Sequence, residues 1–172
     1  MKFLYRVVRS LGSAPAMTTK ELNFRPAAGE DFGYIYDLCE ATMRAYVETA
    51  FGDRFEAIAR PTIQNLLGRS LFSKIYVDEV LVGAIAFEHH DTHIQLEELY
   101  IEAASQNQGI GTMVMKRLFK ESLSLGLPIR LNVLASNGAR YFYEKLGFAI
   151  TGSNTAVNFM EYRPPGIVAS VA

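Results

Sequence analysis

The sequence predicts a single mixed α+β domain with a central sheet of six to seven strands and about four helices. Three observations lead to this class. The chain has 172 residues, which is the length of one ordinary domain. Its hydrophobic content of 49% and charged content of 20% are typical of a globular protein. Segments with helical spacing and segments with strand-like alternation follow one another without a repeat, a low-complexity tract or an interdomain linker.

Residues 1–19 are interpreted as an N-terminal extension that need not belong to the domain, which we place at residues 20–172. The extension is basic and partly apolar, but Arg6 and Arg9 interrupt the continuous hydrophobic stretch that a signal peptide needs. Met17 is an alternative start of the chain. No segment approaches the roughly 18 apolar residues of a membrane span, so we expect a cytoplasmic protein without a membrane partner.

The first half of the domain predicts one strand and three helical regions. Residues 20–27 alternate between apolar and polar and stop at a proline, as a strand at a sheet edge does. Helical spacing follows from about residues 31–39, then in a second region over 43–51 and in a third over 55–67. Pro61 lies inside the third region and predicts a kink there.

The second half alternates between strands and helices. Residues 72–90 predict two strands joined by a tight turn at Asp78–Glu79, and residues 91–101 predict a third strand of the same meander. A long helix is expected over 106–125. A further strand is expected over residues 128–135 and a short helix over residues 136–146. A closing hairpin is expected, with strands over residues 148–152 and 156–163.

The strand at 91–101 changes phase. Ile94 and Leu96 are two residues apart and point to one face, as do Leu99 and Ile101, but three residues separate Leu96 from Leu99. A β-bulge near Glu97–Glu98 would restore the phase. The alternatives are a strand buried on both faces and a strand that ends early.

Charge and cysteine content narrow the function classes. The formal net charge is −1, from 17 basic and 18 acidic residues, which gives no general affinity for nucleic acid. The single cysteine, Cys39, excludes an intrachain disulfide and is consistent with a reducing compartment.

The segment QNQGIG, residues 106–111, precedes the long helix and carries no carboxylate. Helix N-termini attract anions, and glycine lets a phosphate approach the backbone N–H groups closely. A P-loop would need Lys and Ser or Thr after the second glycine, but Thr112 and Met113 follow it. A Rossmann turn would need a third glycine where Val114 stands. Both of these phosphate-binding patterns therefore fail. On this segment alone a plain glycine-containing loop is favoured over a phosphate site of another kind.

This segment resembles the Q/R-x-x-G-x-G/A acetyl-CoA signature of the GNAT N-acetyltransferase superfamily, and its compact single-domain bacterial members in particular. The preceding LYI and the later NGARYFYEKLGF are also similar to that family, and the resemblance covers roughly residues 20–163. It implies a mostly antiparallel twisted sheet with a splayed fourth and fifth strand. The pantetheine arm would lie in that opening and pair with the strand backbone. The cofactor-binding residues that it implies are Leu99, Tyr100, Ile101, Gln106, Asn107, Gln108, Gly109, Ile110, Gly111, Thr112, Asn137 and Tyr143.

The resemblance implies that Tyr143 is the general acid. Its hydroxyl, with a usual pKa near 10, is protonated at neutral pH and can protonate the departing thiolate. Tyr143 also falls on an apolar helix stripe with Ala139, Phe142 and Leu146, so a packing role is the alternative. Asn137 is either a cofactor ligand or an ordinary helix N-cap.

Glu97 and Glu98 are candidates for the general base, because an acceptor ammonium must lose a proton before it can attack. We prefer Glu98, which the expected bulge would turn into the opening. Solvated strand glutamates are the alternative. His89, His90 and His93, with Asp91, match no zinc spacing and predict a solvated turn, so no metal is expected.

The sequence therefore predicts an acetyl-CoA-dependent N-acetyltransferase that acts by direct transfer to an amine, as a monomer or homodimer. A non-catalytic acyl-CoA-binding module and a general nucleotide-binding domain are the alternatives. The family resemblance places the wall of the acceptor site in the region of five aromatic residues: Tyr34, Tyr36, Tyr46, Phe51 and Phe55. Nothing in the sequence identifies the acceptor.

Overall fold

The computed structural model describes residues 20–166, so the expectations for residues 1–19 lie outside the described residues. Seven strands form one sheet in the order β1-β2-β3-β4-β5-β7-β6. The strands are β1 (Leu22–Pro26), β2 (Phe72–Val77), β3 (Val80–His89), β4 (Ile94–Ile101), β5 (Ile129–Leu134), β6 (Ala149–Ser153) and β7 (Val157–Tyr162). The α-helices are α1 (Phe32–Phe51), α2 (Phe55–Gly68), α3 (Ile110–Leu125) and α4 (Ala139–Lys145).

The sheet is mostly antiparallel, as predicted. Among the described strands only β4 and β5 pair in parallel, and all other neighbours are antiparallel. The tight turn between β2 and β3 is also confirmed, since Asp78 and Glu79 both have positive φ angles, 50° and 66°. Two central residues of this kind match the right-handed twist of a two-residue hairpin. The mixed α+β class is therefore confirmed.

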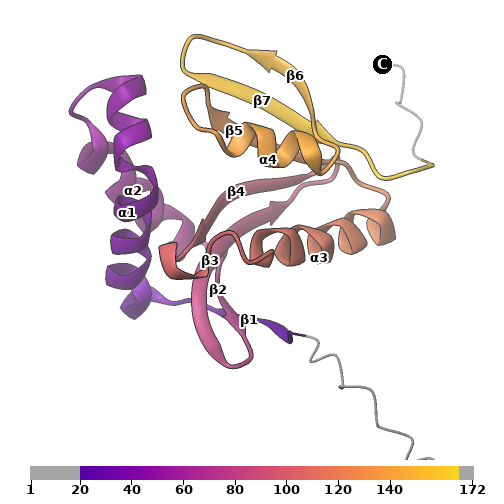
Figure 1. Cartoon of the computed structure of the whole chain (residues 1–172), viewed down its shortest axis with the longest axis horizontal. Coiled ribbons are helices and arrows are strands. Elements are labelled where there is room, and N and C mark those ends of the chain that lie inside the picture. Colours follow the sequence, from indigo (N-terminus) through magenta and orange to yellow (C-terminus); the bar gives the residue numbers. More distant parts are fainter. Residues whose placement is uncertain (1–19, 167–172) are drawn as a thin grey trace, which may run out of the picture.

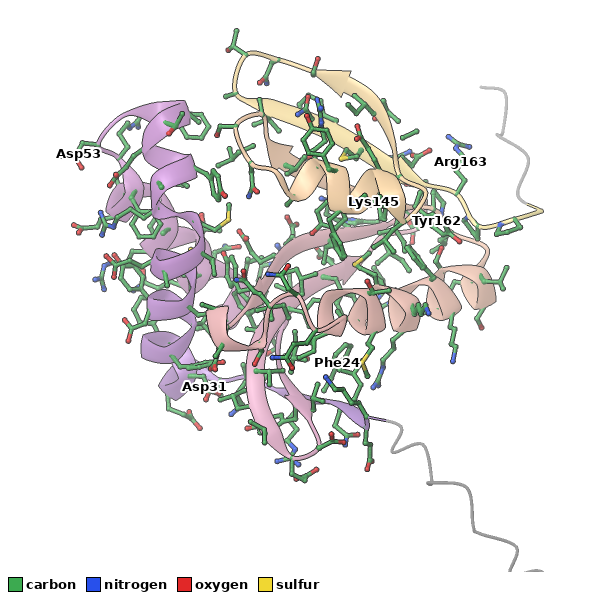
Figure 2. All side chains as sticks on the ribbon, in the orientation of Figure 1. Phe24, Asp31, Asp53, Lys145, Tyr162 and Arg163 are labelled. Carbon is green, nitrogen blue, oxygen red and sulfur yellow. The ribbon has the colours of Figure 1, made fainter. Side chains whose placement is uncertain are left out.

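Helices cover both faces of the sheet (Figure 1). One hydrophobic cluster joins α1 and α2 to alternate residues of the central strands, such as Ala84, Ala86 and Tyr100. The other joins α3 and α4 to the intervening residues, such as Ile85 and Leu96. Within the second cluster Tyr162 of β7 stacks on Phe119 of α3 with ring centroids 4.2 Å apart. Figure 2 shows Tyr162 beside the end of α4.

The two helical regions predicted at 31–39 and 43–51 are one helix, α1, of 20 residues. The interval between them, residues 40–42, contains no glycine or proline to break the helix, and the Thr42 hydroxyl donates to the Leu38 carbonyl at 2.7 Å. Gly52, with a φ of 73°, ends it. Pro61 lies within α2, whose bounds agree with the predicted third region. Among residues 20–166 no helix is long and apolar enough to cross a membrane.

Gly83 of β3 lies against the part of β4 that borders the candidate site. A Cβ atom built on it would lie 2.2 Å from the Tyr100 carbonyl oxygen, and this backbone atom cannot move without disturbing the β3–β4 pairing. We expect Gly83→Ala to lower the free energy of unfolding by about 1–3 kcal/mol, the usual cost of overpacking. Urea unfolding would measure it.

Gly68→Ala is the matched control for this substitution. A Cβ atom on Gly68 meets nothing within 4 Å, and Gly68 is the last residue of α2. Alanine favours a helix, so the control should be as stable as the parent or slightly more stable. Equal stabilities of the two variants would show that the close approach at Gly83 is relaxed at no cost.

Candidate active site

Strand β4 carries the predicted β-bulge. Glu98 pairs with Ala86 of β3, but the next pair joins Leu96 to Phe87, so Glu97 has no opposite residue. The extra residue puts Leu99 and Ile101 on the same face as Leu96, against the cluster of α3 and α4. It puts Glu98 and Tyr100 on the other face. The interpretation of the phase change as a bulge is confirmed.

Strands β4 and β5 separate just where the bulge begins. They pair only at Ile94–Ile129, Gln95–Arg130 and Leu96–Leu131, after which β5 continues beside β7 alone. Beyond Leu96, the edge of β4 that faces β5 has no strand partner among residues 20–166. Its backbone groups are therefore available to an extended ligand, which could pair with them as an added strand does.

A cleft of about 900 Å³ occupies this opening. Four parts of the chain form it: the exposed edge of β4, the turn before α3, the start of α4 and one face of α1. Of the residues predicted to bind the cofactor, all except Gln108 line it: Leu99, Tyr100, Ile101, Gln106, Asn107, Gly109, Ile110, Gly111, Thr112, Asn137 and Tyr143.

The N-terminus of α3 presents free N–H groups to the cleft. Within residues 20–166, the backbone N–H groups of Ile110, Gly111 and Thr112 donate to no protein acceptor. The first bonded amide of the helix is that of Met113, which donates to the Gly109 carbonyl at 3.0 Å. Three such donors at the positive end of a 16-residue helix form a site suited to a phosphate.

The predicted start of this helix at Gln106 is wrong, because α3 begins at Ile110. Residues 106–109 instead form a turn in which Asn107 and Gly109 have φ angles of 58° and 79°. The side chains of Gln106 and Gln108 stabilise the turn by hydrogen bonds to backbone carbonyls that precede it. The Gln106 amide donates to the Ile101 carbonyl at 2.9 Å and the Gln108 amide to the Ala104 carbonyl at 2.8 Å. The helix is therefore about 24 Å long rather than about 30 Å.

The two glycines of the turn serve different purposes. Gly109 is needed for its left-handed conformation, and a Cβ atom on it would meet nothing within 4 Å. Gly111 is needed for a close approach, since a Cβ atom there would lie 3.2 Å from the Phe142 ring of α4. Phe142 therefore packs the start of α4 against the start of α3, so that Tyr143 and the free N–H groups line the same cleft.

Tyr143 lies on α4 and lines the cleft in the opening between β4 and β5. Its ring packs edge-on to Phe142 and Phe148, at centroid distances of 5.1 and 5.5 Å. Burial raises the pKa of Tyr143 well above its usual value of 10, and the nearby Glu98 carboxylate raises it further. The phenol is therefore protonated over the whole neutral range. The structure gives this side chain both the packing contacts and the position of a proton donor.

Asn137 lies just before α4 and combines two contacts. Its side-chain oxygen accepts a hydrogen bond from the Ala139 amide at 2.9 Å, as a capping residue does. Its side-chain nitrogen lies 3.7 Å from the Met43 sulfur of α1, on the cleft wall. The N-cap residue of α4 is Gly138, so Asn137 bonds the first turn from one position earlier, and its position on the cleft wall leaves a ligand role open to test.

The prediction that the bulge turns Glu98 into the opening is wrong, because the bulge puts Glu98 on the face of β4 that α1 and α2 cover, and Glu98 does not line the cleft. It lines a second, smaller cavity of about 60 Å³ between α1, α2 and β4, together with Tyr100 and Cys39. Burial raises the pKa of Glu98 to about 7, the Tyr100 hydroxyl opposes the rise, and the Glu97 carboxylate adds to it. A carboxyl whose pKa lies near neutral suits a general base. Met43 and Tyr100 line both cavities and separate them.

Glu97 and the histidines lie away from both cavities. Burial and the Glu88 carboxylate raise the pKa of Glu97. His89 is within 2.8 Å of Glu121, and His90 stacks on His93 with ring centroids 4.6 Å apart. Within residues 20–166, no three His, Cys, Asp or Glu side chains are arranged to hold a metal ion.

Five lining residues on the face of α1 that borders the cleft were not predicted from the sequence: Leu38, Ala41, Thr42, Met43 and Ala45. Of the five aromatic residues expected in the acceptor wall, only Tyr46 lines the cleft, while Phe55 lines the smaller cavity. Tyr34 instead donates to Glu102 at 2.9 Å. The only sequence signal for this face of α1 was the spacing of its small residues, and that spacing is equally typical of close packing between helices.

A charged side chain at the start of α3 should abolish phosphate binding there. We expect Gly111→Glu to weaken acetyl-CoA binding by at least about tenfold, because losing one hydrogen bond to a charged phosphate costs about 1.5–3 kcal/mol. The added negative charge opposes binding further. Calorimetry would measure the affinity, and Gly68→Glu, which adds the same charge in open space on α2, is the control. Undiminished binding by a folded Gly111→Glu variant would contradict the phosphate site.

Three comparisons with known proteins bear on this site. Residues 40–164 match a family model described as an acetyltransferase (GNAT) domain. No curated protein matches the chain. Among solved structures, the PaiA N-acetyltransferase of Thermoplasma acidophilum, in complex with coenzyme A, is similar with a TM-score of 0.69 and 20% identity, over 83% of this chain and 99% of that one.

Two further structures have the same fold. The ribosomal-protein-S18-alanine N-acetyltransferase of Escherichia coli is similar with a TM-score of 0.63 and 17% identity, over 88% of this chain and 99% of that one. An acetyltransferase of Thermus thermophilus has a TM-score of 0.65 and 15% identity, over 83% and 96% of the two chains. Because these identities are low, the likeness to these structures establishes the fold alone.

Proposed function

Because the chain belongs to the GNAT acetyltransferase family, we propose that it transfers the acetyl group of acetyl-CoA directly to a primary amine. One observation carries the proposal. A single cleft combines three free N–H groups at the start of α3, an unpaired edge of β4 and the hydroxyl of Tyr143. These are a site for a diphosphate, a backbone for an extended pantetheine arm and a proton donor where that arm would end.

The proposed reaction forms a C–N bond and breaks a C–S bond. The amine nitrogen attacks the thioester carbonyl carbon, and backbone N–H groups of β4 near Leu99 stabilise the negative charge that develops on the oxygen. Glu98 accepts one proton from the acceptor ammonium before the attack. Tyr143 gives its proton to the departing sulfur and regains one, through solvent, from the nitrogen of the tetrahedral intermediate, so the products are the amide and the free thiol of CoA.

Cys39 supports direct transfer rather than an acetylated enzyme. It is the one cysteine of the chain, it is buried, and it lines the smaller cavity rather than the cleft. Burial raises its pKa to about 11, so the thiol is protonated and is a poor nucleophile at neutral pH. The free thiol is also consistent with a reducing compartment such as the cytoplasm.

Release of CoA thiol from acetyl-CoA, measured across a panel of primary amines, tests the proposal. We expect release to require both the protein and an amine, and to yield the acetylated amine in equal amount. Acetyl-CoA that binds without any amine-dependent release would instead identify a non-catalytic acyl-CoA-binding module. Preferential binding of ATP over CoA would overturn both.

A further inference from the structure

The smaller cavity, between α1, α2 and β4, is lined almost wholly by apolar side chains. Val47 and Met43 contribute from α1, and Phe55, Ile58 and Ile63 from α2. Thr62 also lines it, but the Thr62 hydroxyl is already donated to the Ile58 carbonyl at 2.8 Å. The polar groups that remain are the thiol of Cys39, the hydroxyl of Tyr100 and the carboxyl of Glu98, which lie together at the β4 side.

Glu98 has no cationic partner in this cavity. Within residues 20–166 no lysine, arginine or histidine lines it. The neighbours that affect the Glu98 carboxyl are Tyr100 and the like-charged Glu97. A carboxylate removed from water and left without a positive charge is unfavourable, so this position favours a cationic ligand.

The cavity adjoins the end of the cleft where the thioester would lie. Met43 and Tyr100 line both spaces, and the Met43 sulfur is 3.7 Å from the Asn137 side chain on the cleft wall. Tyr100 is fixed within the core, at 3% exposure, whereas Met43 is unbranched and partly buried. A nitrogen placed between Glu98 and the cleft would therefore lie beside Met43, with its substituent in the smaller cavity.

We propose that this cavity holds the carbon chain of the acceptor, which is a primary amine on a short, uncharged alkyl group. The inference rests on the proposed acetyl transfer and specifies its substrate class. Glu98 pairs with the ammonium and then accepts its proton. The apolar side chains of α1 and α2 surround the alkyl group, and Met43 limits its size.

The size of the cavity sets the expected length of the alkyl group. An engineered apolar cavity of about 150 Å³ binds benzene, so one of about 60 Å³ is too small for an aromatic ring and accepts only the end of a short, unbranched chain whose first carbons lie beside Met43. A second ammonium on the same chain would enter an apolar space that offers no second carboxylate. Butylamine and 1,4-diaminobutane, which share a carbon chain and differ in one ammonium, are therefore the decisive pair of probes.

The two amines are compared by measuring the release of CoA thiol at saturating acetyl-CoA. We expect kcat/KM for butylamine to exceed that for 1,4-diaminobutane by at least about tenfold, the discrimination that an apolar pocket provides. Thr62→Leu fills the cavity and should raise the KM for butylamine by about the same factor without changing the Kd of acetyl-CoA. Thr49→Leu is the matched control, because Thr49 makes the same bond to its own helix, to Ala45, on the exposed side of α1.

Met43→Ala supplies a gain of activity that misfolding would not produce. Joining the two spaces should raise kcat/KM for phenethylamine at least about tenfold relative to butylamine, and Met43→Leu should not. Equal use of butylamine and the diamine, or an unchanged butylamine KM in Thr62→Leu, would overturn the inference while the proposed function stands. Absence of thiol release with every amine would overturn the proposed function as well.

Discussion

Replacing Tyr143 with phenylalanine is expected to slow acetyl transfer by about 10²–10⁴-fold, the usual contribution of a general acid, with acetyl-CoA affinity nearly unchanged. Phenylalanine keeps the edge-on contacts with Phe142 and Phe148 and removes only the hydroxyl. Single-turnover measurements would report the chemical step free of product release. The substitution therefore separates the packing role of this residue from its proposed role in proton transfer.

The raised pKa of Tyr143 does not oppose this role. Burial raises the pKa of the phenol, and the same surroundings raise the pKa of the thiolate that leaves beside it. Tyr141→Phe is the matched control, because Tyr141 lies on the same helix but is 58% exposed. A Tyr143→Phe variant as fast as the parent would mean that the side chain only packs and that water protonates the thiolate.

Glu98→Gln is expected to show the second large effect, a loss of about 10²–10⁴-fold near neutral pH. Glutamine keeps the size of the side chain and removes its basicity. Because the pKa of Glu98 is raised to about 7, the parent rate should rise through that pH and then level off as the carboxyl becomes fully ionised. Because the Glu98→Gln variant lacks the general base, it can use only amine that is already deprotonated in solution.

The two pH–rate profiles should therefore converge at high pH. A primary amine with a usual pKa near 10.4 loses its proton about tenfold more often with each unit of pH, so the variant should recover steadily above pH 8. Glu97→Gln, which removes a neighbouring carboxyl outside both cavities, should keep the shape and plateau of the parent profile with a slightly lower midpoint, because the Glu97 carboxylate adds to the raised pKa of Glu98. Parallel profiles for Glu98→Gln and the parent would remove Glu98 from the mechanism and leave the cofactor site untouched.

The same substitution should stabilise the fold at alkaline pH. The folded pKa of Glu98, about 7, is above its usual 4.5, so the folded state holds the extra proton between these values. The free energy of unfolding of the parent therefore falls as pH rises from about 4.5 to 7, on the order of 2 kcal/mol in total. Glu98→Gln should lack this fall. Urea unfolding of both proteins at pH 5 and pH 8 would measure it.

Local patterns in the sequence were sufficient for the elements and for the bulge. The three-residue interval between Leu96 and Leu99 breaks a strict two-residue period, and a bulge is the local geometry that restores it. The start of α3 was placed four residues too early, because Asn107 has a positive φ that only the surrounding turn imposes. The division of α1 into two regions was wrong because residues 40–42 contain no glycine or proline that would end the helix.

The smaller cavity depended on contacts that the sequence does not encode locally. The bulge was expected to turn Glu98 into the opening, but α1 and α2, which precede β4 by some 30 to 60 residues, enclose Glu98 in the smaller cavity instead. The separation of Glu98 from Tyr143 by Met43 arises in the same way. Such relations follow from the packing of helices across the sheet, which periodicity alone does not determine.

Direct acetyl transfer is tested most directly by following a label in the acetyl group through a single turnover. With an amine that supports thiol release, we predict that the label passes from acetyl-CoA to the amide in one phase, matching the release of CoA thiol. Without an amine, no label should become attached to the protein, since Cys39 is buried and protonated. Label that accumulates on the protein, or thiol release without labelled amide, would contradict the account.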